Sequence, residues 1–502
     1  MTAGILQLAA KGNEDLYLIN DPQITYFKLV YKRYSNFAIE SIPQNFNSIP
    51  DFGKQVTCTL SKNADLINKI YVVITLPKIN CIPETNTLLT LNKCAWIKYV
   101  GWYIIKSVEI EIGSYVIDKH YGDWLYIWNE LTTKNNTLKS INKMIGNVDE
   151  LTSYTENKDS YVLYIPLLFW FCRDIGLALP IVALEFSDVK ININFAKLDE
   201  ILKLSPTHYI DIENNIVHFK VGDILYQKIN NNVTYIQFVY FDNKNNNIHR
   251  LYYNKITPNT IIGYDNVSNK SIYKIKSLDD KYNIDIKQNS IETIHINKQT
   301  NFNWINNLCI TDVKLLVDYI YLDTTERYNF IHKEHNYIID VLIFDNDKLL
   351  TNNSTKLKYS YKCQCKEFII RAHLTYLEQS NFTIDYFMSD NILTSLKIIM
   401  NGIERLNIND INYYNLIQNY QYHSNTSPKG VFLYSFSLFP VLQIPYGICN
   451  LNKIDDLQFI IQVHKSINYL NSAKIRVYAL GISNFKVMNG YCELINESNR
   501  IH

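Results

Sequence analysis

The chain has 502 residues, 47% of them hydrophobic and 19% charged, and this composition excludes a largely disordered protein. Its 49 lysine and arginine residues almost balance its 48 acidic residues, so the net charge of +1 provides no strong field for binding nucleic acid. The nine cysteines are scattered and odd in number, which fits a reducing compartment, and the N-terminus shows no secretory signal, so we expect synthesis in the cytoplasm.

A small basic cluster near the N-terminus consists of Lys28, Lys32 and Arg33, which lie among aromatic residues. We expect these side chains to lie on a solvated rim or to pair with acidic groups between domains. The alternative is a contact with an inner partner or with lipid headgroups.

Alternation of apolar and polar residues predicts strands along much of the chain. Residues 69–77 are apolar on both faces and end at a proline, as expected for an interior strand. Residues 107–118 alternate and contain Gly113-Ser114, which predicts a hairpin turn, and residues 188–195 alternate in the same way. Mostly strands with few helices indicates an all-β sandwich or barrel.

Two carboxylates, Glu109 and Glu111, lie on one face of the predicted 107–118 hairpin. Such a pair can imitate the acid and base of a glycosidase. We expect instead a solvated face or a subunit contact, because the corresponding positions of a later repeat hold Lys397 and Ile399.

Two segments have a helical pattern. In residues 122–131 Asp123 is placed to cap the helix, and four apolar residues share one stripe at spacings of three and four: Trp124, Leu125, Trp128 and Leu131. In residues 322–335 Asp323 and Glu326 have the spacing of a capping box.

The most apolar stretch of the chain, 162–186, reads VLYIPLLFWFCRDIGLALPIVALEF. A proline and two charges interrupt it well short of the roughly 20 residues that cross a bilayer, so it does not predict a membrane span. We expect a strand over 164–171 and a turn at Arg173-Asp174. Cys172 is expected to be a buried, inert thiol, because no histidine partner is evident.

Motifs for catalysis are weak. The sequence lacks a Walker loop, a Gly-x-Ser-x-Gly motif and a His-Glu-x-x-His motif. His332 and His335 flank Glu334 at a spacing that could hold a metal ion, but no further ligand is evident, so we expect an exposed helix end. Cys363 and Cys365 precede a predicted strand, and we expect them to be structural rather than redox-active or metal-binding.

An internal repeat is the most informative feature of the sequence. An alternating hairpin, a short aromatic segment, a proline-containing apolar stretch and an alternating strand occur twice in the same order. The clearest matched pairs are 107–113 with 395–402, 123–130 with 412–419, and 187–195 with 455–463. We therefore predict two copies of one β domain.

The first copy is interrupted after Phe195 by about a hundred residues rich in asparagine, lysine and tyrosine. Their alternating aromatic residues predict strands in a surface insertion, with hairpin tips at 230–232 and 245–247. Asn-x-Ser/Thr sequons are expected by chance in such a chain and matter only if a glycosylation system reaches the protein; they include Asn135, Asn232, Asn353 and Asn381.

Five stretches resemble the double jelly-roll major capsid proteins of nucleocytoplasmic large DNA viruses: 20–42, 100–131, 164–195, 317–330 and 430–458. The resemblance covers most of the chain outside the insertion. It implies two eight-stranded antiparallel jelly rolls in tandem, with short helices and a long loop insertion. It also implies that three subunits form a pseudo-hexagonal capsomer, that capsomers tile an icosahedral shell, commonly over a membrane, and that the insertion forms an outward-facing tower.

The resemblance places the domain boundaries as follows. Residues 1–22 form an N-terminal arm. Residues 23–335 form the first jelly roll, which includes a tower-like surface insertion at about 198–308, and residues 336–502 form the second jelly roll.

The expected function is therefore that of a structural capsid protein in the virion, made in the host cytoplasm. It is expected to have no catalytic residue, cofactor, metal or small-molecule substrate, and no direct contact with nucleic acid. Its expected partners are itself as a homotrimer, neighbouring capsomers, minor capsid proteins and an inner viral membrane. The alternatives are a related scaffold or a minor or penton capsid protein, and, from a different class, a carbohydrate-binding or carbohydrate-cleaving jelly roll.

Overall fold

The computed structural model describes residues 2–80, 94–155, 157–206, 208–213, 219, 223–229, 232–245, 248–255, 262–263, 274–277, 282–294, 308–375, 392–406, 410–464, 467 and 472–495. The chain divides into two compact units, Met1–Phe37 and Ala38–His502. The N-terminal unit contains helices α1 (Ala3–Ala9) and α2 (Leu16–Ile19), neither of which buries a side chain. Lys28, Lys32 and Arg33 are exposed within it.

Two four-stranded sheets make up the first sandwich of the larger unit. One sheet has the order β1 (Phe37–Gln44), β19 (Asp312–Leu322), β3 (Leu66–Leu76) and β9 (Tyr161–Pro166). The other has the order β2 (Gln55–Thr59), β10 (Val189–Phe195), β6 (Ile105–Ile112) and β7 (Tyr115–Tyr121). Counted along the chain, the strand orders are 1-8-3-6 and 2-7-4-5, which is the arrangement of a jelly roll.

The second sandwich repeats this arrangement. One sheet has the order β20 (His335–Phe344), β29 (Ala473–Met488), β23 (Gln364–Leu374) and β26 (Val431–Ser435). The other has the order β22 (Ser354–Tyr359), β28 (Leu457–Val463), β24 (Leu393–Met400) and β25 (Ile403–Glu404). The orders are again 1-8-3-6 and 2-7-4-5, so the chain folds as two tandem jelly rolls, as the sequence predicted.

Shorter elements complete the two jelly rolls. The helices are α3 (Val100–Tyr103), α4 (Gly122–Thr132), α5 (Leu138–Met144), α6 (Asp149–Thr152), α7 (Trp170–Arg173), α8 (Leu198–Ile201), α9 (Thr324–His332), the π-helical η5 (Tyr413–Ile417) and α11 (Gln418–Tyr422). The remaining 3₁₀ turns are η1 (Asn135–Thr137), η2 (Ile175–Leu177), η3 (Ile181–Ala183) and η6 (Leu451–Lys453). The short strands are β4 (Ile79–Asn80), β5 (Cys94–Trp96), β8 (Asn157–Lys158), β11 (Leu202–Leu204), β21 (Lys348–Leu350), β27 (Cys449–Asn450) and β30 (Tyr491–Ile495).

The repeated hairpins follow from turn chemistry. In β6–β7 the turn contains Gly113 at a φ of 64°, and in β24–β25 it contains Asn401 at 49° and Gly402 at 81°. These left-handed conformations suit two-residue hairpin turns, and asparagine and glycine tolerate them best. The predicted hairpin at 107–118 and its repeat at 395–402 are therefore confirmed.

The apolar stretch 162–186 contains more turns than the sequence indicated. Strand β9 ends at Pro166, and α7 begins at Trp170, so the predicted strand over 164–171 was too long. A short helical turn forms there because Trp170 and Phe171 both enter the core, which an alternating strand would not allow. The predicted turn at Arg173-Asp174 is confirmed, since the Asp174 side chain accepts a hydrogen bond from the backbone N–H of Gly176 at 2.8 Å.

Both predicted helices are present, but only one has its predicted cap. The Asp323 side chain accepts a hydrogen bond from the backbone N–H of Thr324, the first residue of α9, but Glu326 does not complete the predicted capping box. In α4 the capping position is held by Tyr121, and the Asp123 carboxylate makes no capping hydrogen bond. The prediction for Asp123 was wrong because this carboxylate faces arginines of the second jelly roll.

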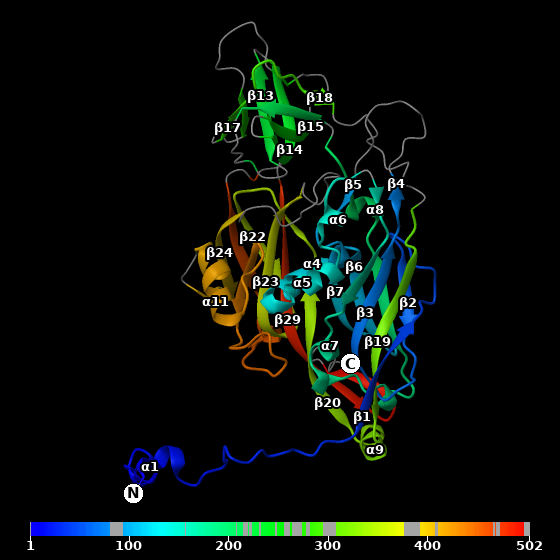
Figure 1. Ribbon diagram of the computed structural model, residues 1–502, viewed down its shortest axis with the longest axis vertical. Helices are drawn as coiled ribbons and strands as arrows, with labels where there is room; N and C mark the ends of the chain where they lie inside the picture. The colour runs from blue at the N-terminus through cyan, green and yellow to red at the C-terminus, as the bar shows by residue number, and fades with distance from the viewer. Residues whose placement is uncertain are drawn as a thin grey trace. The chain divides into compact units, whose positions relative to one another are not determined.

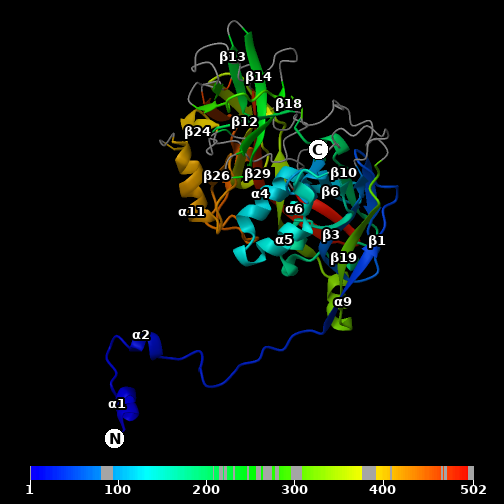
Figure 2. The same cartoon turned by 45° about the horizontal axis from the view of Figure 1, so that its top comes forward.

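The insertion between β10 and β19 forms a sheet of its own. Its strands have the order β17 (Asn283–Asp285), β16 (Lys274–Ser277), β13 (Ile224–Ile229), β14 (Asn232–Asn245), β15 (Ile248–Lys255), β12 (His208–Ile212) and β18 (Thr293–Ile294). Figure 1 shows this sheet beyond the ends of both jelly rolls, and in Figure 2 it is turned toward the viewer. The two predicted tips fall between paired strands, with 230–231 and 246–247 outside the described residues.

The insertion has a separate hydrophobic core and closely spaced ends. Its buried cluster includes Ile210, Leu225 and Leu251, and contains no residue of either jelly-roll cluster. His208, near its start, pairs directly with Ile294, near its end. Because the two ends are neighbours in one sheet, a short connection can replace the sheet between them.

We predict that replacing residues 208–294 with a short Gly-Ser linker leaves the jelly rolls folded. Among the described residues, the buried core of the insertion shares no member with the jelly-roll cores, so the cores of the jelly rolls remain intact without it. Far-UV circular dichroism and the melting temperature of the truncated chain should match those of the full chain within a few degrees. A truncated chain that is insoluble or melts far lower would show that the insertion supports the sandwiches.

Candidate functional site: the contact between the two jelly rolls

The two jelly rolls share one hydrophobic core. Helices α4 and α7 of the first pack against the outer face of the sheet β20-β29-β23-β26 of the second, and Figure 1 shows α4 between the two groups of strands. Trp124 of α4 lies 5.7 Å from Tyr478 of β29, and Trp170 of α7 lies 5.6 Å from Phe485, measured between ring centroids. Aromatic pairs at this separation bury large apolar areas and add directional contact energy.

The sheet of the second jelly roll is thus buried on both faces. On β23, Phe368 and Ile370 belong to the core inside the second jelly roll, whereas Ile369 belongs to the core shared with the first. Alternating residues of one strand point to opposite faces, so every residue from Cys365 to His373 is buried. A strand buried on both faces requires that any charge on it have a partner.

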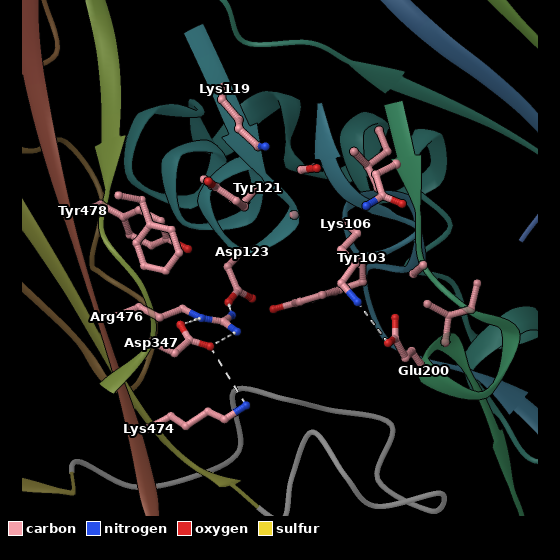
Figure 3. A pocket seen from close by; sticks show the side chains of 17 residues that line it. Tyr103, Lys106, Lys119, Tyr121, Asp123, Glu200, Asp347, Lys474, Arg476 and Tyr478 are labelled. Atoms are coloured by element: carbon pink, nitrogen blue, oxygen red, sulfur yellow. Dashed lines mark hydrogen bonds and ion pairs between the residues drawn. The ribbon is translucent and has the colours of Figure 1, made fainter. Parts of the chain in front are cut away.

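Two arginines meet at this interface. Arg371 of β23 and Arg476 of β29 are directly opposite each other in the antiparallel register, an unfavourable arrangement for like charges. Asp123 of α4 forms ion pairs with both, and Asp347 accepts two hydrogen bonds from Arg476, at 2.6 and 2.9 Å. Figure 3 shows the Asp123 and Asp347 carboxylates on Arg476. The first jelly roll therefore supplies a carboxylate that the second requires.

A second polar contact joins β7 and β20 across the interface. The Asp118 carboxylate accepts a hydrogen bond from the backbone N–H of Leu342 at 2.9 Å, and its other oxygen lies 2.9 Å from Nε2 of His120. Asp118 and His120 are both buried. A carboxylate bound to a backbone amide fixes the register of β20 against the first jelly roll.

A third contact centres on Asp340 of β20. Its carboxylate lies 3.0 Å from Nζ of Lys366 and 3.4 Å from Nη1 of Arg173, which also lies over the ring of Trp128. Burial raises the pKa of Asp340 and lowers that of Lys366, although each partner opposes the shift. Desolvation is the largest cause of both shifts, and removing Asp340 would leave Lys366 as a buried charge without that ion pair.

We call Asp123, Arg371, Arg476 and Asp347 the Asp123 cluster. A pocket of about 590 Å³ lies beside this cluster (Figure 3). Its charged groups are paired: Nζ of Lys106 lies 3.3 Å from Glu200, and Nζ of Lys474 lies 4.0 Å from Asp347. Aromatic rings of Tyr103 and other residues form its walls, and its lining contains neither histidine nor cysteine. The described residues that line the pocket therefore offer paired charges and aromatic rings.

The structure separates the residues considered for metal binding. His332 is exposed at the end of α9, as predicted, but His335 is the first residue of strand β20 and is half-buried, so the prediction of a helix end was wrong for His335. His332 Nδ1 lies 3.0 Å from the carbonyl of Tyr328, and His335 Nε2 lies 2.9 Å from the carbonyl of Phe330, so the two rings engage different backbone groups. Glu334 binds Lys486 at 2.8 Å. Within the described residues, no cluster of three or more histidine, cysteine or acidic side chains could hold a metal ion.

Of the cysteines considered for chemistry, Cys363 and Cys365 are buried among apolar groups, whereas Cys172 is only partly buried against the shared core, not fully buried as predicted. Burial raises the pKa of Cys172 to about 12 and raises that of Cys365 well above its ordinary value. Cys363 and Cys365 both belong to the core of the second jelly roll. Raised thiol pKa values favour the protonated, weakly nucleophilic form.

The remaining sequence candidates lie at the surface or outside the described residues. Glu109 lies 3.2 Å from Lys119, and Glu111 lies 3.5 Å from Lys190, so each carboxylate pairs across neighbouring strands. Asn353 is exposed. The other three sequons cannot be placed, because Asn381 and the side chains of Asn135 and Asn232 lie outside the described part of the chain. No helix in the described residues is long and apolar enough to cross a membrane.

Sequence reasoning did not identify Asp118, Arg371 or Arg476 as interface residues. At the end of the segment 366–373, KEFIIRAH, Arg371 and His373 alternate with apolar residues, which normally indicates a solvent-facing side of a strand. Buried charges on a strand give the same sequence pattern as exposed charges, so the two cases can be distinguished only when the element that covers the strand is known.

Comparisons with known proteins agree with this architecture. Residues 25–242 match the family model "Major capsid protein N-terminus", and residues 326–491 match "Large eukaryotic DNA virus major capsid protein". The chain is 37% identical to "Probable capsid protein 4" of Acanthamoeba polyphaga mimivirus, over 97% of this chain and 98% of that protein. It is 29% identical to the "Major capsid protein" of Phaeocystis pouchetii virus, over 98% of each.

A solved structure, the Faustovirus major capsid protein, shares the fold with a TM-score of 0.66 at 11% identity, covering 95% of this chain and 94% of that chain. The fold and the buried contact between its halves define a double jelly-roll protein of a viral shell. The chain belongs to the family of large eukaryotic DNA virus major capsid proteins. It is a structural, non-enzymatic protein of the virion.

We predict that Trp128→Ala destabilises the folded chain by about 3–5 kcal/mol, because it removes a fully buried ring from the shared core. Thermal unfolding should show a clearly lower melting temperature. Trp128→Phe keeps an aromatic ring and should lose much less folding stability. Melting of Trp128→Ala at the wild-type temperature would contradict the placement of this ring.

We predict that Asp123→Ala costs about 3–5 kcal/mol of folding stability, because Arg371 and Arg476 are left opposite each other beneath α4. The matched control is Asp159→Ala, which removes an exposed carboxylate 3.1 Å from Lys78 and should cost less than about 1 kcal/mol. Denaturant unfolding measures both variants. Equal, small effects would mean that the Asp123 contact contributes no more than a surface ion pair.

Proposed function

We propose that three copies of this chain form a pseudo-hexagonal capsomer and that capsomers tile an icosahedral shell. The supporting observation is the core shared by the two jelly rolls, which makes each chain a rigid pair of similar lobes. Three such pairs around one axis present six nearly equivalent sides, so a trimer can pack as a hexagon does. Contacts between capsomers can then be individually weak, because each capsomer makes several at once.

The parts of the chain fit this proposal as follows. Residues 23–335, including the insertion at 198–308, form one lobe, and residues 336–502 form the other. The insertion serves as an outward-facing tower, consistent with its separate core. The N-terminal arm, residues 1–22, together with the exposed Lys28, Lys32 and Arg33, faces minor capsid proteins or an inner membrane.

A scaffold or minor capsid role is the alternative within the same fold. The near-neutral charge of the chain fits a coat that is separated from the genome in either case. The copy number of the protein in purified particles separates these roles, because a major capsid protein dominates the particle and a scaffold is absent from it.

We predict that the purified chain is a stable trimer in solution. Size-exclusion chromatography with light scattering should give three times the mass of the 58.9 kDa chain, and negative-stain images should show three-lobed particles with a hexagonal outline. A monomer at micromolar concentration would contradict the proposal, since the interface expected for an obligate trimer buries roughly 2,000–5,000 Å².

A further inference from the structure

The repeat leaves one helix without the cover that its counterpart has. In the first jelly roll α4 follows the hairpin β6–β7, and in the second the helical segment 411–422 follows the hairpin β24–β25. The two segments are counterparts, with 123–130 matching 412–419. Figure 1 shows α4 between the jelly rolls and α11 on the outer side of the second.

The counterpart segment exposes apolar side chains. Leu416 is 61% exposed, Ile417 is 45% exposed and Tyr420 is 90% exposed, whereas nearly all of α4 is buried. On the opposite side of the segment Tyr414 and Gln418 are buried against their own jelly roll. A contiguous group of exposed apolar residues on a well-packed helix is typical of an interaction surface.

The sheet that would receive such a helix is also exposed. In the second jelly roll the outer face of β20-β29-β23-β26 is covered by α4. The corresponding outer face of β1-β19-β3-β9 in the first jelly roll carries Val162, 41% exposed, and Tyr164, 43% exposed. Register places Val73 beside Tyr164, and Tyr71 beside Leu316, on the same face. Helix and sheet face are therefore both accessible, and both carry exposed apolar residues. The sheet face also carries two charged residues, Lys314 opposite Val73 and Asp312 opposite Thr75.

The charges of the two faces match in register. In the covered contact Asp123 meets Arg371 and Arg476, which are opposite each other on the third and eighth strands of the sheet. The position that matches Asp123 is Asn412.

In the first jelly roll the positions that correspond to Arg371 and Arg476 are Thr75 and Asp312, which are also opposite each other. The sixth strand of each jelly roll supports this correspondence. In the first jelly roll Val162 lies opposite Thr75, and in the second Val431 lies opposite Arg371. In the covered contact the acid Asp123 of α4 therefore faces two arginines. At the exposed face the neutral amide Asn412 would face a threonine and an acid.

We propose that the 411–422 helix of one copy packs on the β1-β19-β3-β9 face of the next copy, as α4 packs on the second jelly roll within a chain. This inference rests on the proposed trimer and specifies its interface. Leu416, Ile417 and Tyr420 cover Val162 and Tyr164, and Asn412 lies at Thr75 and Asp312. Each chain contributes one helix and one sheet face, so the contact is head-to-tail and closes into a ring.

The first test replaces apolar residues of the helix. Leu416→Asp/Tyr420→Asp should convert the trimer to monomer in light scattering, while circular dichroism and melting of the monomer keep the folded signature, because both side chains are exposed. The matched control is Ile403→Asp, which changes a residue that is 74% exposed on β25, in the other sheet of the same jelly roll. This control should remain trimeric.

The second test exchanges charges between the two faces. Asn412→Asp should weaken the trimer at least tenfold in dissociation constant by placing a carboxylate against Asp312. Adding Thr75→Arg and Asp312→Arg to that variant copies the Asp123 cluster and should restore the trimer. Asn352→Asp, at an exposed bend of the second jelly roll, is the control and should have no effect.

The outcomes separate the two proposals. If the wild-type chain is not a trimer, the proposed capsomer and this interface both fail. If the wild type is a trimer and Leu416→Asp/Tyr420→Asp remains one, the capsomer stands and this interface is wrong. If Asn412→Asp weakens the trimer but the two arginines do not restore it, the helix does not meet Thr75 and Asp312.

Discussion

The contact of α4 with the second jelly roll is the constraint on which the rest of the structure depends. It buries the outer face of the sheet β20-β29-β23-β26, and with it Arg371, which faces the half-buried Arg476 across neighbouring strands. Asp123, which belongs to the first jelly roll, pairs with both arginines and offsets the repulsion between them. Because buried charges without partners are costly, the two halves are stable together in this arrangement and not in a shifted one.

This contact explains how two similar domains take different roles. The repeat gives both jelly rolls the same strand order, yet the second has its outer sheet face covered and the first has it exposed. The helices that follow the two hairpins show the reverse: α4 of the first jelly roll is buried, and the 411–422 helix of the second exposes apolar side chains. A chain with one covered and one exposed copy of the same contact has a direction, and a directional subunit is suited to closed rings and shells.

Much of the fold could be predicted from local patterns. Alternation and turn residues indicated the hairpin at 107–118 and its repeat at 395–402, because glycine and asparagine at positive φ have few alternatives. Two details were wrong for a common reason. Asp123 was read as a cap and 164–171 as a strand, but an arginine pair and a packed aromatic turn, both set by tertiary contacts, decided those positions.

The sequence by itself determined the strands, the duplication and the class of fold, since these depend on periodicity, turn chemistry and strings of residues close in the chain. Only the tertiary structure decided which faces are buried between the jelly rolls. Arg371 and His373 alternate with apolar residues, as they would on a solvated face, and both are buried. Arg371 is buried because α4, more than 200 residues earlier, supplies Asp123 against it. The periodicity of a sequence shows that the two faces of a strand differ in polarity, but it does not show which element packs against each face.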